Sequence, residues 1–219
     1  MDTSPPGGGA VIIFNGGDAL PRRVAEELPA GAFTIAADSG VEHALALEWP
    51  IDLAVGDFDS VSVAALAAAE ASGAEVERHP VAKDRTDLEL ALDAAAARRP
   101  DEIVVVGGHG GRVDHFLAAA LLLTRDAYAG IAVRAIVGPA RLHVVRDRLE
   151  LEGEPGDLVT LLAIAGRVAG VTTAGLRYPL VDEPLEPGST QGVSNELTAP
   201  TASVTVRGGV VLAVHTPSG

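Results

Sequence analysis

The run Ile103-Val104-Val105-Val106 decides the fold class, because it contains no polar residue at all. A strand that is apolar on both sides is typical of a parallel sheet whose two faces are covered by helices. Glycines follow at once in Gly107-Gly108, and a long apolar segment from about residue 113 to 127 has the length of a helix. The sequence therefore predicts a strand, a loop and a helix of an α/β protein.

The same alternation of apolar runs and helical segments extends from residue 10 to residue 137. The expected strands are 10–14, 33–37, 51–56, 75–78, 103–106 and 132–137. The expected helices are 18–28, 41–49, 62–72 and 113–127, with one more that begins at Thr86. Thr86 and Glu89 have the spacing of a capping box, in which the threonine hydroxyl accepts a hydrogen bond from the Glu89 amide. We therefore expect a parallel sheet between layers of helices.

The character of the chain changes near residue 139. From Leu142 onward no convincing 3.6-residue period remains, and glycines and prolines separate short apolar or alternating runs at 158–164, 203–207 and 210–215. Several short strands with turn signals at this spacing are typical of a small β-sandwich. We expect a flexible leader over residues 1–9, an α/β domain over 10–139 and a β-sandwich over 140–219.

Composition and charge exclude several classes of protein. The chain has 219 residues, of which 47% are hydrophobic and 21% are charged, as in globular proteins. It contains no cysteine, which excludes disulfides, cysteine-based zinc sites and thiol nucleophiles and favours an intracellular location. The formal net charge of -14 argues against a broad nucleic-acid surface. No stretch approaches the roughly 18 apolar residues of a membrane helix, and residues 1–9 lack the regions of a signal peptide.

Four loops carry acids and glycines at the carboxyl ends of the predicted strands, where open parallel sheets bind their ligands. They are residues 15–18, 38–40, 56–60 and 107–114. Asp87 joins them if its helix begins at the same edge. The clustering of acids and glycines at one edge indicates a functional site more strongly than any single motif does.

Asp57 and Asp59 lie two residues apart, with Phe58 between them. In extended backbone the two carboxylates point to one side and Phe58 points to the core. Two carboxylates held at one point suit a magnesium ion that also binds phosphates. The alternative is a solvated turn, or a cap by Asp59 on the following helix.

The neighbouring charged residues also have alternatives without function. Asp87 in a first helical turn is stabilising by itself, and Asp38 has the character of a turn or cap residue. Lys83, Asp84 and Arg85 have the composition of a solvated charge run.

The glycine-rich loop 107–111 precedes a helix, so its backbone amides can receive a phosphate. Arg112 would add a fixed pair of donors. The loop lacks the ending of a Walker A motif, and a tight turn between strand and helix is the alternative. His115 is more consistent with a structural role. No nucleophile elbow, H-E-x-x-H motif or cysteine cluster is present.

Five motifs in order resemble those of the thiamine pyrophosphokinase family. They are Ala37-Asp38-Ser39-Gly40, Gly56-Asp57-Phe58-Asp59-Ser60, Asp84-Arg85-Thr86-Asp87-Leu88-Glu89, Gly110-Gly111-Arg112-Val113-Asp114-His115 and, in the C-terminal part, the run from Thr172 to Leu180 with Gly192-Val193-Ser194-Asn195-Glu196. The resemblance covers nearly the whole chain after the leader.

This resemblance implies a Rossmann-like ATP-binding domain followed by a β-sandwich that binds thiamine. It also implies a cytoplasmic homodimer with active sites between the subunits. The reaction would transfer the diphosphate of ATP to the hydroxyl of thiamine, giving thiamine diphosphate and AMP. Magnesium would be the cofactor, and ATP the co-substrate.

The family motifs also assign expected roles to residues of this chain. Magnesium would be held by Asp57, Asp59 and Asp87. Catalysis would involve these three acids with Arg112 and Asp114, of which Asp114 is a candidate general base. ATP binding would involve Asn15, Asp38, Ser39, Gly40, Asp57, Gly110, Gly111 and Arg112. Substrate binding would involve Lys83, Asp114, Thr172, Thr173, Tyr178, Ser194 and Asn195, with Thr172, Thr173 and Tyr178 coming from the partner subunit.

Two alternatives remain at this point. One is a diphosphokinase of the same architecture that acts on another hydroxymethyl heterocycle, such as a pterin. The other is a nucleotide-binding regulatory module without turnover, for which damaged metal ligands would be expected. The run from Thr172 to Leu180 favours thiamine, and the presence of Asp57, Asp59 and Asp87 favours an enzyme.

Overall fold

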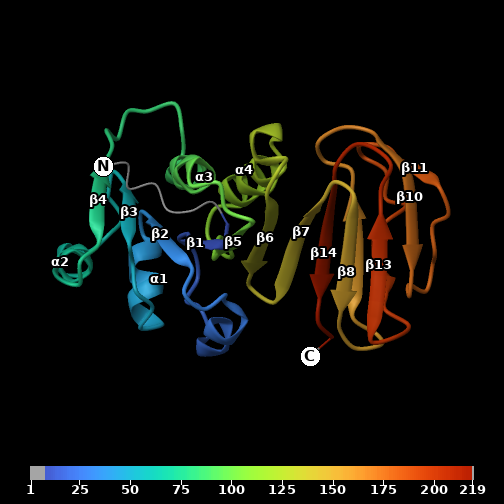
Figure 1. Ribbon diagram of the computed structural model, residues 1–219, viewed down its shortest axis with the longest axis horizontal. Helices are drawn as coiled ribbons and strands as arrows, with labels where there is room; N and C mark the ends of the chain where they lie inside the picture. Colours follow the sequence, from blue (N-terminus) through green and yellow to red (C-terminus); the bar gives the residue numbers. More distant parts are fainter. Residues whose placement is uncertain (1–7, 219) are drawn as a thin grey trace. The chain divides into compact units, whose positions relative to one another are not determined.

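The computed structural model describes residues 8–218, so residues 1–7 of the predicted leader and Gly219 lie outside the described residues. The chain forms two compact units (Figure 1). The first contains residues 8–119 and 130–138, and the second contains residues 120–129 and 139–218. Gly9, at the end of the predicted leader, donates its amide to the Asp101 carboxylate at 2.9 Å.

The first unit is built on a parallel sheet with the strand order β6-β5-β1-β2-β3-β4. The strands are β1 (Ala10–Phe14), β2 (Phe33–Ala37), β3 (Leu53–Gly56), β4 (Glu75–Arg78), β5 (Glu102–Val106) and β6 (Ala132–Val137). The apolar runs of β1, β2, β3 and β5 are buried almost throughout, whereas the edge strand β4 is mostly exposed. The parallel pairing confirms the predicted α/β sheet. Strands β1 to β4 follow one another in one direction, and the chain then crosses back to place β5 on the other side of β1.

Helices cover both faces of this sheet. They are α1 (Gly40–Ala46), α2 (Val63–Ala71), α3 (Asp87–Ala97) and the first part of α4 (Val113–Leu123), with the short 3-10 helix η1 (Arg22–Glu27). The end of α4 and the 3-10 helix η2 (Asp126–Tyr128) belong to the second unit. Buried residues of α1 and α2 share one core with Ile12, Phe14 and Ala36. Helix α3 also packs against β1, β2 and β3, but none of its residues belongs to that core, so it lies on the other face (Figure 1).

Three expectations for the helices differ from the structure. Helix α1 ends at Ala46, three residues before the expected end at Trp49. Residues 18–28 do not form an α-helix, because only η1 is present between Pro21 and Pro29. A residue that precedes proline is disfavoured in the helical region, and Leu28, which precedes Pro29, has extended backbone. Helix α4 ends at Leu123, four residues earlier than expected. The predicted cap at Thr86 is confirmed, since its Oγ1 accepts from the Glu89 amide at 3.2 Å.

The second unit is a β-sandwich of two antiparallel sheets, with strand orders β12-β9-β14-β7 and β11-β10-β13-β8. Its strands are β7 (Ala140–Val145), β8 (Arg148–Glu152), β9 (Leu158–Leu162), β10 (Val168–Ala174), β11 (Glu183–Leu185), β12 (Asn195–Glu196), β13 (Thr201–Thr205) and β14 (Val211–Thr216). Alternate residues of both sheets, such as Leu161, Val171, Val204 and Val211, form one common core. The predicted β-sandwich is confirmed.

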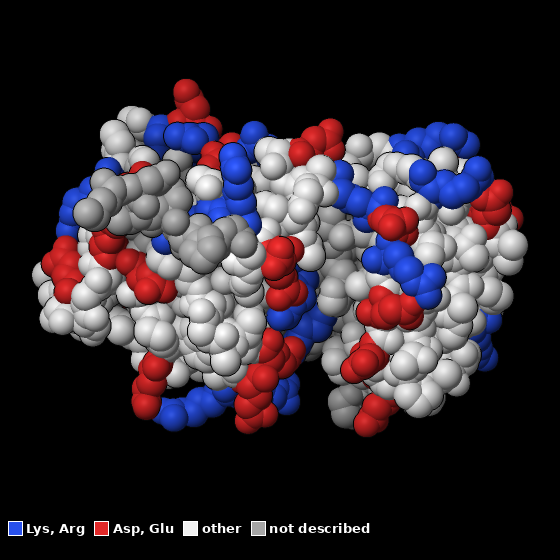
Figure 2. Space-filling model, viewed as in Figure 1, with Lys and Arg blue, Asp and Glu red and all other residues white. Residues whose placement is uncertain are grey.

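The surface agrees with the acidic composition. On the face drawn in Figure 2, acidic and basic side chains of the described residues are interspersed, and no broad basic surface is visible. Among residues 8–218, no helix has the length and the apolar character that spanning a bilayer requires.

A buried polar cluster fixes the end of the chain to the second unit. The Asp157 carboxylate is buried, lies 2.9 Å from His215 Nε2 and accepts hydrogen bonds from the amide and hydroxyl of Ser218. It also accepts from the Glu154 amide. Burial disfavours the ionised carboxylate, but these hydrogen bonds outweigh it and hold the pKa of Asp157 far below its ordinary value of 3.8.

We expect Asp157→Asn to lower the free energy of unfolding by about 2 kcal/mol at neutral pH, because the charge-assisted hydrogen bonds are lost. The native pKa lies below 3.8, so the stabilisation is present above that pH and is lost as the pH falls below it. The measurement is urea denaturation of both proteins over a range of pH. Exposed Asp147 supplies the control Asp147→Asn, and a difference that persists unchanged at the lowest pH would contradict the assignment.

Candidate functional site

The first feature of the site is the switch point between β1 and β5, where the chain connections diverge in opposite directions. Open parallel sheets bind ligands beside the carboxyl ends of two such strands. The loops after these strands pack backbone to backbone, since the Gly108 amide donates to Gly16 at 2.6 Å and the Asp18 amide donates to His109 at 2.7 Å. A Cβ on Gly107 would lie 2.3 Å from the Asn15 carbonyl oxygen, so only glycine permits this approach.

The loop after β2 packs against the loop after β1. A Cβ on Gly40 would lie 2.0 Å from the Phe14 carbonyl oxygen. His43, on α1, places Nδ1 at 2.9 Å from the Asn15 carbonyl oxygen and Nε2 at 3.2 Å from that of Gly17. Ser39 lies against Gly16, where an added Cβ would meet its Oγ at 2.3 Å. Asn15, Ser39 and Gly40 are therefore brought together at this edge.

A group of carboxylates lies at the ends of β2 and β3. One oxygen each of Asp38, Asp57 and Asp59 lies within 4.8 Å of the others. The two strands are paired in register, with Ala37 opposite Val55, and the Asp38 amide donates to the Val55 carbonyl oxygen at 3.0 Å. The carboxylates of Asp38, Asp57, Asp59 and Asp87 are called the carboxylate cluster below.

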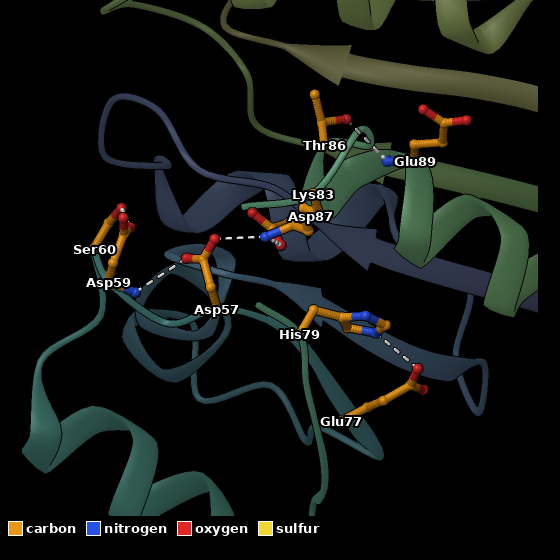
Figure 3. A network of polar contacts seen from close by, with 9 residues as sticks. All are labelled: Asp57, Asp59, Ser60, Glu77, His79, Lys83, Thr86, Asp87 and Glu89. Carbon is orange, nitrogen blue, oxygen red and sulfur yellow. Dashed lines mark hydrogen bonds and ion pairs between the residues drawn. The ribbon is translucent and has the colours of Figure 1, made fainter. Parts of the chain in front are cut away.

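The backbone at Phe58 differs from the expectation. Phe58 is buried in the core beneath the sheet, but its φ is 60°, in the left-handed region, so the stretch is not extended. A non-glycine residue there is strained and is typical of functional sites. The turn lets the Asp59 amide donate to Asp57 Oδ1 at 3.3 Å and aligns the Ser60 hydroxyl with Asp59 at 2.9 Å (Figure 3).

Lys83 joins Asp57 to Asp87. Its Nζ donates to Asp57 Oδ2 at 2.5 Å and lies 3.1 Å from Asp87 Oδ1, although the angles at Asp87 are outside those of a hydrogen bond (Figure 3). The hydrogen bond from Lys83 holds the pKa of Asp57 below its usual value, against the opposing effect of burial. Burial disfavours the Lys83 ammonium, but its contacts with the two carboxylates prevail and raise the pKa of Lys83.

The carboxylate cluster has the properties of a cation site. Asp38 Oδ1 is buried and accepts no hydrogen bond from a described residue, and the buried Asp87 Oδ1 has its ion pair with Lys83 but no hydrogen bond. Burial raises the pKa of Asp38, and the negative charges of Asp87 and Asp57 act in the same direction. A hard divalent cation would satisfy such oxygens and offset their mutual repulsion. The residues present therefore fit magnesium.

Asp38 belongs to the closely spaced group, whereas the expected magnesium ligand Asp87 lies beside it through Lys83. The sequence predicts Asp38 as a nucleotide contact near the metal, or as a turn or cap residue, but not as one of the metal ligands. The signal that could have found it was strand order, because a residue that follows β2 lies next to the residues that follow β3 when the two strands pair in parallel.

Arg112 and Asp114 lie in the exposed segment that opens α4, after Gly110 and Gly111. Their side chains form a two-point ion pair, with Nη2 at 2.5 Å and Nε at 3.2 Å from the carboxylate oxygens. This pair raises the pKa of Arg112 and lowers that of Asp114. The charges and hydrogen-bonding groups of Arg112 and Asp114 are therefore paired with each other.

In the β-sandwich, Asn195 and Thr173 hold the loop that presents Tyr178. The buried Asn195 side chain accepts from the Tyr178 amide at 2.9 Å and donates to the Tyr178 carbonyl oxygen at 2.7 Å. Thr173 Oγ1 is buried and accepts from the Leu180 amide at 2.9 Å. The Tyr178 side chain is 62% exposed. The side chains of Asn195 and Thr173 therefore hold the backbone of the loop that carries Tyr178.

The remaining predicted residues of the sandwich are exposed. Thr172 Oγ1 accepts from the Asp182 amide at 3.0 Å, and the Ser194 amide donates to Thr160 Oγ1 at 3.0 Å. Ser194 has a left-handed backbone, with φ of 56°. The roles of Thr172, Thr173, Tyr178, Ser194 and Asn195 toward a substrate stay predictions.

Two family models match the chain in order. The model described as thiamin pyrophosphokinase, catalytic domain, matches residues 25–134, and the model described as thiamin pyrophosphokinase, vitamin B1 binding domain, matches residues 143–211. A thiamine pyrophosphokinase of Bacillus subtilis (strain 168) is 32% identical over 152 residues, which cover 66% of this chain and 68% of the relative.

Solved structures agree with these matches. The crystal structure of thiamine pyrophosphokinase from Bacillus subtilis has a TM-score of 0.85 at 26% identity and covers 96% of this chain and 100% of that chain. Thiamin pyrophosphokinase from Candida albicans shares the fold, with a TM-score of 0.77 at 14% identity over 99% of this chain and 95% of that chain.

We expect Asp57→Asn to weaken the binding of Mn²⁺ to the protein at least about tenfold, because one anionic ligand of the cluster is lost. Calorimetric titration without any other ligand measures this affinity. Asp84→Asn removes the same charge from an exposed position in the neighbouring loop and serves as the control. Equal affinities of the two variants would show that the cluster does not hold the cation.

Proposed function

This chain belongs to the thiamine pyrophosphokinase family, and on that premise we propose that it transfers the diphosphate of ATP to the primary hydroxyl of thiamine. The products are thiamine diphosphate and AMP. The observation that carries the proposal is the match of a catalytic model and a vitamin B1 binding model to successive parts of one chain. The carboxylate cluster at the end of the catalytic sheet supports it.

Magnesium is the proposed cofactor, held by Asp57 and Asp59 with Asp38 and Asp87 beside them. The cluster supplies hard oxygen donors, and two of its buried oxygens accept no hydrogen bond from a described residue. When bound, the ion would neutralise charge on the phosphate oxygens and align the polyphosphate.

The chain's own residues provide the rest of the nucleotide site. At the switch point between β1 and β5, the backbone amides of Gly110 and Gly111 would face the phosphates, whereas those of Asn15, Asp18, Gly107 and Gly108 hold the loops in place. Arg112 supplies a planar pair of donors once it leaves Asp114. Asp114 is then free to accept the proton of the attacking hydroxyl, as the proposed general base.

Tyr178 is the proposed platform for thiamine. Thiamine is a cation, and the face of an exposed aromatic ring attracts cations. The Arg177 guanidinium lies 5.7 Å from the centre of the Tyr178 ring and pairs with Glu196 at 2.9 Å. The Tyr178 face therefore already accepts a positive charge.

We propose a homodimer whose active sites combine residues of both subunits, in the cytoplasm where ATP is available. The support is an apolar stripe on α4, formed by Val113, Phe116, Leu117 and Leu121 at helical spacing, with exposed fractions from 37% to 69%. Such a stripe is typical of a surface that a second protein covers. A second copy of this chain is the occupant that the proposal requires.

Incubation of the purified protein with ATP, magnesium and thiamine tests the activity. We expect AMP and thiamine diphosphate in equal amounts, which chromatography separates and measures. Formation of ADP, or consumption of a hydroxymethylpterin in place of thiamine, would refute the thiamine assignment. Asp57→Asn should reduce turnover by about two orders of magnitude or more while the protein stays folded.

We expect Tyr178→Ala to raise KM for thiamine about tenfold and to leave KM for ATP unchanged, because only the cation on the ring loses a contact. Steady-state kinetics measure both constants, and Tyr178→Phe keeps the ring as the control. Mixing the Tyr178→Ala and Asp57→Asn proteins tests the shared site, since a mixed dimer contains one site with both native residues. An unchanged KM for thiamine would remove Tyr178 from the site.

A further inference from the structure

Lys83 is the only lysine in the chain, and all the other basic residues among the 16 counted are arginines. We propose that Lys83 is the resident counter-ion of the carboxylate cluster, which leaves Asp57 when magnesium enters and then binds the polyphosphate. The inference rests on the proposed function. In the enzyme without ligands, the Lys83 ammonium would take the place of the metal ion beside Asp57.

The placement of Lys83 is unusual for its surroundings. Residues 79–86 form the loop between β4 and α3, and all of them are exposed except the half-buried His79 and Lys83. The Lys83 side chain is 14% exposed and turns inward between Asp57 and Asp87 (Figure 3). A lysine in a surface loop normally keeps its ammonium in water. The inward position is therefore set by the two carboxylates.

Lys83 and a metal ion would compete for the same carboxylate. The ammonium lies 2.5 Å from Asp57 Oδ2, and a magnesium ion bound through Asp57 would lie about 2 Å from a carboxylate oxygen. The two cations would then be separated by only about 5 Å and would repel each other strongly in a partly buried site. Entry of the divalent ion thus favours departure of the ammonium.

Another nearby cation is already engaged elsewhere. The Arg78 guanidinium lies 5.3 Å from the centre of the Phe58 ring, and it pairs with Glu70 at 3.8 Å. The ion pairs of Asp57 and Asp87 in the described part of the chain are made with Lys83 and not with Arg78.

Lysine chemistry suits a cation that must move. An ammonium is a compact charge on a flexible four-carbon stem, whereas a guanidinium is planar and prefers a fixed two-point partner. This chain uses arginine at its other basic positions. Lys83 also lies three residues before the cap at Thr86, so its stem can turn toward the polyphosphate without disturbing α3.

The first test compares Lys83→Met with Arg85→Met in calorimetric titrations with Mn²⁺ and no nucleotide. Arg85 lies in the same loop and pairs with Asp93 at 3.2 Å, so its replacement removes the same charge without touching the cluster. We expect Lys83→Met to bind Mn²⁺ at least about tenfold more tightly than the native protein, and Arg85→Met to stay within about twofold. We also expect kcat of Lys83→Met to fall at least about tenfold, because the polyphosphate loses a cation.

Unchanged or weaker Mn²⁺ binding by Lys83→Met would overturn the inference. If neither protein bound the ion, the metal role of the cluster and the inference would both be wrong. Binding without tightening would overturn the inference alone, and the product assay with ATP and thiamine judges the proposed function separately.

The second test uses the single lysine as a probe. Protein labelled with ¹³C at lysine Cε gives one signal from Lys83 in a two-dimensional NMR spectrum. We expect Mg²⁺ alone to shift this signal, with a midpoint equal to that of a calorimetric titration with Mg²⁺. A signal that does not move while calorimetry records bound Mg²⁺ would show that Lys83 stays in place, and would overturn the inference.

Discussion

Repulsion between carboxylates is the constraint on which the arrangement of the first unit depends. Asp38, Asp57 and Asp59 converge at the ends of two neighbouring strands, and Asp87 approaches from α3. The single charge of Lys83 offsets only part of this repulsion, so the fold must also hold the carboxylates in place. The buried sheet does this, because the strands that carry the acids are anchored in a continuous apolar core. The left-handed residues Asp38 and Phe58 are the local cost of the arrangement.

The sequence alone predicted much of the framework. The strands at 10–14, 33–37 and 132–137 have the bounds that their apolar runs indicated, and the strand at 75–78 has its predicted bounds although three of its four residues are charged. The reason is physical: a short β-branched or apolar run between glycines or prolines has few alternatives once it must be buried. The helix predicted at 18–28 is wrong, because Pro21 and Pro29 limit the segment although its other residues favour a helix. Composition shows a preference, whereas proline imposes a boundary.

The site was harder to predict than the fold, because its geometry depends on strand order. Local patterns placed acids and glycines in loops, but only the pairing of β2 with β3 brings Asp38 to Asp57. The motif residues of the sandwich show a second difficulty. Asn195 and Thr173 appear in a motif beside Tyr178, yet their side chains hold the backbone of its loop. A motif indicates that residues belong together and leaves open which of them contact a substrate.

The single lysine also makes this chain unusual as a substrate for proteolysis. An endoprotease that cleaves only after lysine has one possible cut, which would separate residues 1–83 from 84–219. That cut falls in an exposed loop, but the side chain that the protease must bind is held between two carboxylates. The contacts of Lys83 with Asp57 and Asp87 therefore protect this peptide bond from the protease. The rate of cleavage after Lys83 reports whether the side chain is held by these two carboxylates.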